Sequence, residues 1–210
     1  MSGFRPSIRI LAAVSVTATA LLLSVSHANA ATPKASTHTA KPSKSATHST
    51  KSATHSKQTV AQQDYTFYDS TVPSEIPAHQ LIAAYADGDY KVPRSSVSDP
   101  ATVIWIDVNG GDANATALDV EPGDATPAEA AVWVRTRLTD HPDATAVVYT
   151  MRSEWAATKA SVATLPASMQ SKVRWWIADP TGVPHIVPGS QATQWYWGAD
   201  YDINSALPGF

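Results

Sequence analysis

One stretch of the 210-residue chain decides how the rest is interpreted: residues 115–124, ATALDVEPGD. An apolar run ends there at two carboxylates separated by one residue, and a Pro-Gly pair follows. If residues 117–121 form a strand, alternation places Asp119 and Glu121 on one face and Val120 on the other. Two acids this close repel, which raises the pKa of one toward the range that a general acid needs. The alternative is a solvated strand end whose acids cap the next helix.

The first thirty residues have the pattern of an export signal. Arg5 and Arg9 precede a mostly apolar run over residues 10–25, and Ala28-Asn29-Ala30 is a small-x-small cleavage site. The run is short for a membrane span, which needs about 20 apolar residues, and an uncleaved anchor is the alternative. We therefore expect a secreted protein with no membrane association after cleavage. The chain has no Cys, which excludes disulfides and a lipidated N-terminal Cys.

The sequence of residues 31–64 predicts a disordered linker. The segment KSATHST at residues 44–50 is followed by KSATHS at 51–56, and this repeat has no apolar side chain larger than Ala. Such a sequence buries too little surface to offset its ordering entropy. Its His residues have no rigid scaffold around them, so no metal site is predicted. The linker lysines favour a tether to an anionic cell wall, with a plain spacer or a glycosylated segment as alternatives.

The charge of the chain is segregated. All 18 acids lie from Asp64 onward, whereas seven of the 15 Lys and Arg precede it. The eight that remain leave the part of the chain from Asp64 to Phe210 with a formal net charge of −10. This charge argues against a nucleic-acid partner, because phosphate binding needs a basic face.

The domain alternates strand-like and helical segments. A helix is predicted from Pro127 to about Thr139, with Thr126 as N-cap and Glu129 completing a capping box, and a second from Ser153 to about Ala163. Trp105 and Trp133 lie inside apolar patterns and are assigned to the core. Strands are predicted at residues 65–69, 81–85, 102–108, 117–121, 144–150, 173–178 and 192–197.

This alternation predicts an α/β fold with parallel strands. Several strands end in an acid, as expected where function lies at the carboxyl ends of a β/α barrel. A doubly wound sheet would share this geometry, but the chain lacks a Gly-x-Gly-x-x-Gly or Walker loop. We therefore expect a compressed (β/α) TIM-type barrel, closed by pairing residues 65–69 with 192–197.

Six separated pieces resemble the family 25 glycoside hydrolases, lysozyme-type muramidases that cut peptidoglycan. They are similar also to a group of short, exported glycoside-hydrolase-like domains without an assigned activity. The resemblance covers most of the chain from Tyr65 to Asn204. The pieces are Asp69-Ser70, Leu118-Asp119-Val120-Glu121, Tyr149-Thr150, Trp176-Ile177-Ala178, Gln194-Trp195-Tyr196 and Tyr201-Asp202-Ile203-Asn204.

The resemblance implies roles for these residues. Glu121 corresponds to the catalytic acid and Asp119 to its partner, with Asp69 and Asp202 as further catalytic carboxylates. It also implies a barrel without cofactor or metal. The residues expected to contact sugar are Tyr149, Trp176, Gln194, Trp195 and, as a further stacking residue near the end of the chain, Trp197. Core packing is the alternative for the Trp residues.

The domain is short for this family. Its 146 residues from Tyr65 to Phe210 predict lost or shrunken helices, chiefly between the first and fourth strands, because whole barrels rarely have fewer than about 200. We expect a monomeric muramidase-type glycosidase that acts on peptidoglycan or another cell-wall glycan. A catalytically inactive carbohydrate-binding module on a degenerate barrel is one alternative. A barrel hydrolase that uses the acids to hold a divalent cation for phosphodiester cleavage is the other.

Overall fold

The computed structural model describes residues 63–210. The export signal predicted over residues 1–30, and the linker up to residue 62, lie outside the described residues. Within residues 63–210, no helix is both long and apolar enough to cross a membrane. The strands are β1 (Tyr65–Asp69), β2 (Ile82–Tyr85), β3 (Ile104–Asp107), β4 (Ala117–Val120), β5 (Ala146–Met151), β6 (Val173–Ala178), β7 (Ala192–Tyr196) and β8 (Asp202–Ala206).

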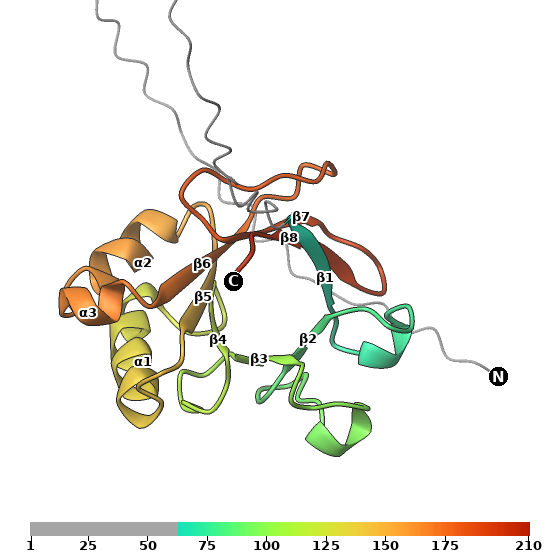
Figure 1. The fold of residues 1–210 in the computed structure, drawn as a ribbon, viewed down its shortest axis with the longest axis horizontal. Helices are drawn as coiled ribbons and strands as arrows, with labels where there is room; N and C mark the ends of the chain where they lie inside the picture. Colours follow the sequence, from blue (N-terminus) through green and yellow to red (C-terminus); the bar gives the residue numbers. More distant parts are fainter. Residues whose placement is uncertain (1–62) are drawn as a thin grey trace, which may run out of the picture. The chain divides into compact units, whose positions relative to one another are not determined.

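The eight strands form one closed barrel in the order β1 to β8 (Figure 1). Closure of the sheet confirms the barrel predicted from the sequence. The neighbours from β1 to β7 are parallel, whereas β8 is antiparallel to both β7 and β1. The prediction of an all-parallel barrel closed by residues 192–197 is therefore wrong. The physical reason is the length of the last connection, because the five residues between β7 and β8 permit only a hairpin, and a parallel crossover takes a dozen or more.

Helices occur on only part of the barrel. They are α1 (Pro127–Asp140), α2 (Trp155–Val162) and α3 (Ala167–Gln170), and all three follow β4 or β5 along the chain (Figure 1). The connections from β1 to β4 contain only the short 3₁₀ turns η1 (Pro73–Glu75) and η2 (Arg94–Ser96). The loss of helices between the first and fourth strands is thus confirmed. The regular alternation of a TIM-type barrel is limited to the segment from β4 to β6.

The predicted start of α1 is confirmed in atomic detail. The backbone N–H and the hydroxyl of Thr126 both donate to Glu129 Oε2, at 2.7 Å each, and Pro127 is the first helical residue. Glu129 thereby satisfies an N–H at the helix start that has no partner within the helix. The helix buries one face against the outside of β4 and β5.

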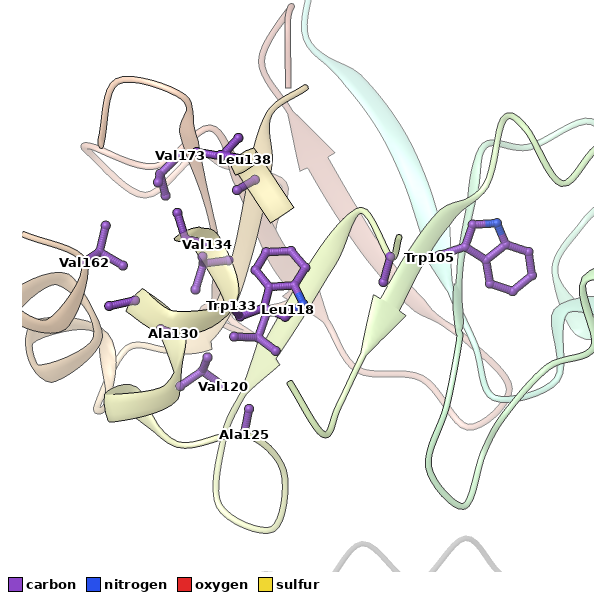
Figure 2. Packing of buried hydrophobic residues seen from close by; sticks show 14 of the residues in the cluster. Trp105, Leu118, Val120, Ala125, Ala130, Trp133, Val134, Leu138, Val162 and Val173 are labelled. Carbon is purple, nitrogen blue, oxygen red and sulfur yellow. The ribbon is translucent and has the colours of Figure 1, made fainter. Parts of the chain in front are cut away.

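The strand β4 separates two apolar clusters. Val120 and Leu118 are fully buried on its outer face, where Figure 2 shows them beside Ala130 and Trp133 of α1. The burial of Trp105 and Trp133 confirms their assignment to the core. Since Val120 faces the helix, alternation turns Asp119 toward the interior of the barrel.

The interior of the barrel is filled by aromatic side chains. The ring of Trp176 packs edge-on against Phe67 and Tyr149, with centroids 5.0 and 4.9 Å apart. Phe210, near the end of the chain, stacks on Phe67 at 5.5 Å. The barrel therefore has a packed, largely aromatic core.

Candidate functional site

Four carboxylates predicted from the sequence lie at one end of the barrel. Asp69 is the last residue of β1, Asp119 lies near the end of β4, and Glu121 follows β4. Asp202 is the first residue of β8, and because β8 runs antiparallel it pairs directly with Asp69. Asp69, Asp119 and Asp202 are each 3% exposed, whereas Glu121 is half-buried. The strand ends thus deliver these acids to a common site.

Two of these acids share a cluster with a third that sequence analysis missed. Single carboxylate oxygens of Asp119, Glu121 and Asp124 all lie within 4.8 Å of one another. Asp124 is brought back toward β4 by the turn containing Pro122 and Gly123, and the backbone N–H of Asp124 donates to the Glu121 carbonyl at 3.0 Å. Burial, and secondarily the charge of Asp87, raises the pKa of Asp124. The Pro-Gly turn in the sequence was the signal that could have identified it.

Within residues 63–210, these three carboxylates form the group that could hold a metal ion. Carboxylate oxygens suit Mg²⁺, Ca²⁺ or Mn²⁺, which prefer hard ligands. Three acids at this spacing are common on protein surfaces without a cation. The sequence-based expectation of no metal therefore stays a prediction.

Asp69 is held by amide donors from two strands. Asn204 Nδ2 of β8 donates to Asp69 Oδ2 at 2.7 Å, and Gln194 Nε2 of β7 donates to the same oxygen at 3.0 Å and to Oδ1 at 3.3 Å. Asn204 Oδ1 in turn accepts from Trp176 Nε1 at 2.8 Å. Asn204 is fully buried and was not predicted as a site residue. Its position two residues after Asp202 on the same strand face was the available signal.

Tyr149 places a neutral donor beside the acids. Its hydroxyl donates to Gln194 Oε1 at 2.9 Å, and the side chain is buried. Burial raises the pKa of Tyr149 well above its ordinary value, and the charges of Glu121, Asp119 and Asp69 raise it further. The phenol therefore stays protonated at neutral pH. The joint effect of three carboxylates on one phenol supports their assignment to a single site.

The residues predicted to contact sugar separate into two groups. Trp176, Tyr149 and Gln194 are 1%, 7% and 2% exposed and hydrogen-bond to other interior residues, so they form the floor of the site. The ring of Trp176 in particular is packed inside the barrel, where a sugar cannot stack on it. Trp195 is half-buried, and Trp197 is 41% exposed. Trp197 is thus the predicted aromatic residue with the greatest open surface.

A β-bulge directs Trp197 toward the site. Gln194 pairs with Asn204, whereas Tyr196 pairs with Ile203, so one extra residue lies in β7. Ile203 faces the opposite side from Asn204, which places Tyr196 outside and returns Trp197 to the inner side. The indole Nε1 of Trp197 accordingly donates to Gln194 Oε1 at 2.5 Å.

Two other acids at strand ends form hydrogen bonds that stabilise the fold around them. Asp179, after β6, accepts from Arg152 at 2.8 Å and His185 at 3.0 Å. Burial opposes ionisation of Asp179, but these two donors outweigh it and lower its pKa. Asp107, at the end of β3, binds backbone N–H groups of the following loop.

Comparisons with protein-family models, with curated proteins and with solved structures found no match. The functional assignment therefore depends on the residues and their geometry.

Proposed function

We propose that the domain is a glycoside hydrolase-like protein that acts on cell-wall peptidoglycan by muramidase-type hydrolysis, on a reduced (β/α) TIM-type barrel. The observation that carries the proposal is the half-buried Glu121, with oxygens of Asp119 and Asp124 within 4.8 Å, at the carboxyl ends of the barrel strands. Secretion is part of the proposal, because peptidoglycan lies outside the cell membrane and residues 1–30 have the pattern of an export signal.

Glu121 is the general acid in this proposal. Glycoside hydrolysis needs a carboxylic acid that protonates the leaving oxygen while positive charge develops on the sugar ring. Asp119 is the partner of Glu121 in this proposal, since carboxylate oxygens of the two residues lie within 4.8 Å of each other. Asp69, held in one orientation by Gln194 and Asn204, stabilises the developing positive charge or orients the substrate's acetamido group. Asp202, paired with Asp69, is the second residue placed for this role.

The test is Glu121→Gln, which keeps the shape of the side chain and removes the proton donor. Release of reducing ends from purified peptidoglycan should fall by about 10²- to 10⁴-fold, the typical contribution of general acid catalysis. Binding to the wall should remain. Glu75→Gln is the matched control, since Glu75 is an exposed residue of η1 and is not one of the clustered acids. Unchanged cleavage by Glu121→Gln would show that the assignment is wrong.

A binding module is the second candidate, and one observation favours it. The indole of Trp197 is 41% exposed beside the acids, which suits stacking on a sugar ring whether or not the bond is cleaved. If the wild type binds peptidoglycan without cleaving it and Trp197→Ala abolishes binding, this function replaces hydrolysis. Loss of cleavage with a chelator, restored by Mg²⁺, would instead indicate a cation-dependent hydrolase.

A further inference from the structure

The side chain of Gln194 makes hydrogen bonds to three parts of the site. Its Oε1 accepts from Tyr149 of β5 at 2.9 Å and from Trp197, after β7, at 2.5 Å. Its Nε2 donates to both carboxylate oxygens of Asp69 on β1, at 3.0 and 3.3 Å. The amide carbonyl thus uses both of its lone pairs, and the amide nitrogen faces a carboxylate.

The orientation of this amide follows from its partners. The tyrosine hydroxyl can donate or accept, but the indole N–H of Trp197 can only donate and an ionised Asp69 can only accept. Rotating the amide by 180° would set the NH₂ group against the indole N–H and the carbonyl oxygen against the carboxylate. Gln194 is 2% exposed, so water does not replace these bonds. A single orientation of Gln194 therefore fixes Asp69 and Trp197 together.

We infer that Gln194 is a positioning residue that couples the aromatic surface of Trp197 to the carboxylate of Asp69. This inference rests on the proposed function and assigns Gln194 a different role from the sugar contact predicted from the sequence. Gln194 does not need to touch substrate. The amide that orients Asp69 is also hydrogen-bonded to Trp197, on which a glycan would stack. The position of the bound glycan and the orientation of the Asp69 carboxylate are therefore fixed together.

Two substitutions separate this role from simple packing. Gln194→Met has a similar length and removes both the donor and the acceptor. Gln194→Glu keeps two acceptor oxygens for Tyr149 and Trp197, but it can donate to Asp69 only when its own carboxyl is protonated. On purified peptidoglycan, Gln194→Met should lower kcat by about 10²-fold at every pH, the scale of a small misplacement of reacting groups. Gln194→Glu should approach wild-type kcat near pH 5 and lose it progressively toward pH 8.

A readout independent of turnover is the indole Nε1–H resonance of Trp197, identified by its loss in Trp197→Phe. In the wild type we expect a shifted resonance that exchanges slowly with water. Gln194→Met should abolish the shift and speed the exchange, and Gln194→Glu should restore both near pH 5. Tyr196→Phe is the matched control, because Tyr196 is exposed on the outer face of the same strand and should leave the resonance unchanged.

The inference is overturned if Gln194→Met retains wild-type kcat, or if the two variants have the same pH profile. If Gln194→Met folds poorly, the inference is tested by kcat of Gln194→Glu alone, measured at pH 5 and at pH 8 relative to the wild type. If the wild type does not hydrolyse peptidoglycan, the proposed function fails, but the resonance still tests the coupling. In that case an unaltered resonance in Gln194→Met rejects it, and a lost shift together with weakened binding to peptidoglycan supports it.

Discussion

Two buried aspartates on the barrel show how position along a strand decides the role of a residue. Asp69 faces the interior, where side-chain amides of Gln194 and Asn204 bind it. Asp107 faces outward, where it accepts from backbone N–H groups of the β3–β4 loop at 2.7 to 2.9 Å and from Trp133 Nε1 at 2.9 Å. Asp69 therefore lies in the candidate site inside the barrel, and Asp107 organises a loop.

We predict that Asp107→Ala destabilises the domain by about 2 to 3 kcal/mol, because the buried N–H donors of the loop and of Trp133 would lose their acceptor. Asp107 is fully buried, so water does not compensate. Urea denaturation followed by tryptophan fluorescence measures the effect. Asp89→Ala, at an exposed position in the preceding loop, is the control and should change the free energy of unfolding by less than about 0.5 kcal/mol. Equal effects of the two substitutions would contradict the structural role of Asp107.

At the scale of elements, the β7–β8 hairpin makes the largest difference to the site. Its turn supplies Trp197, and its second strand supplies Asp202 and Asn204. The backbone N–H of Gly198 donates to Asp202 Oδ1 at 3.0 Å, which ties the turn to the start of β8. The bulge in β7 and this bond together direct Trp197 and Asp202 to the same end of the barrel.

Gly198→Ala should disturb this hairpin. A Cβ atom at position 198 would lie 2.2 Å from the backbone oxygen of Tyr201, so the turn must move. We expect a loss of about 1 to 3 kcal/mol in the free energy of unfolding, the usual cost of overpacking, and a displaced Trp197 indole resonance. Gly111→Ala is the control, since no atom lies within 4 Å of the added Cβ and the backbone is not left-handed there. A wild-type resonance in Gly198→Ala would show that the turn tolerates a side chain.

At the scale of the whole molecule, the acidic domain contains carboxyls whose pKa values move in opposite directions. Burial is the main cause of the raised pKa of Asp107, where the nearby Asp87 adds to it and backbone N–H groups oppose it. The pKa of Asp124 is also raised, by burial first and then by the charge of Asp87. The pKa of Asp179 is lowered, because the hydrogen bonds from His185 and Arg152 outweigh the effect of its burial.

These shifts predict a maximum of stability in weak acid. A carboxyl with a raised native pKa contributes stability that is complete below its unfolded pKa, near 4, and is lost as pH rises through the native value. Asp107 and Asp124 should therefore make the free energy of unfolding rise as pH falls from 7 toward about 4. Asp179 acts in the opposite sense, and its contribution is lost as pH falls below about 4 through its lowered native pKa.

Chemical denaturation at a series of pH values measures this profile. Asp124→Asn removes one of the two raised carboxyls and should reduce the rise in stability between pH 7 and about 4. Asp143→Asn, at an exposed position in the α1–β5 connection, is the control and should leave the profile unchanged. A flat wild-type profile over this interval would contradict the assignment of raised pKa values to Asp107 and Asp124.

The sequence by itself determined the elements that carry local signals. The capping box of Thr126 and Glu129 placed the start of α1, since its bonds join residues three apart. The alternation of Asp119, Val120 and Glu121 predicted which side of β4 faces the helix, and the apolar run at Val173–Ala178 predicted β6. The shortness of the domain indicated missing helices.

Only the tertiary structure decided the end of the barrel and the interior of the site. The strand β8 (Asp202–Ala206) has the polar residues Asp202 and Asn204 on its buried face. It therefore lacks the alternation of apolar and polar residues by which a half-buried strand is predicted from sequence. Those polar groups become favourable inside a protein only because Asp69, Trp176 and the turn at Gly198 satisfy them, and these partners are distant in the sequence or depend on the hairpin. The burial of Trp176 and the bulge that directs Trp197 onto Gln194 likewise arise when the barrel closes, because each depends on contacts between strands that no local pattern encodes.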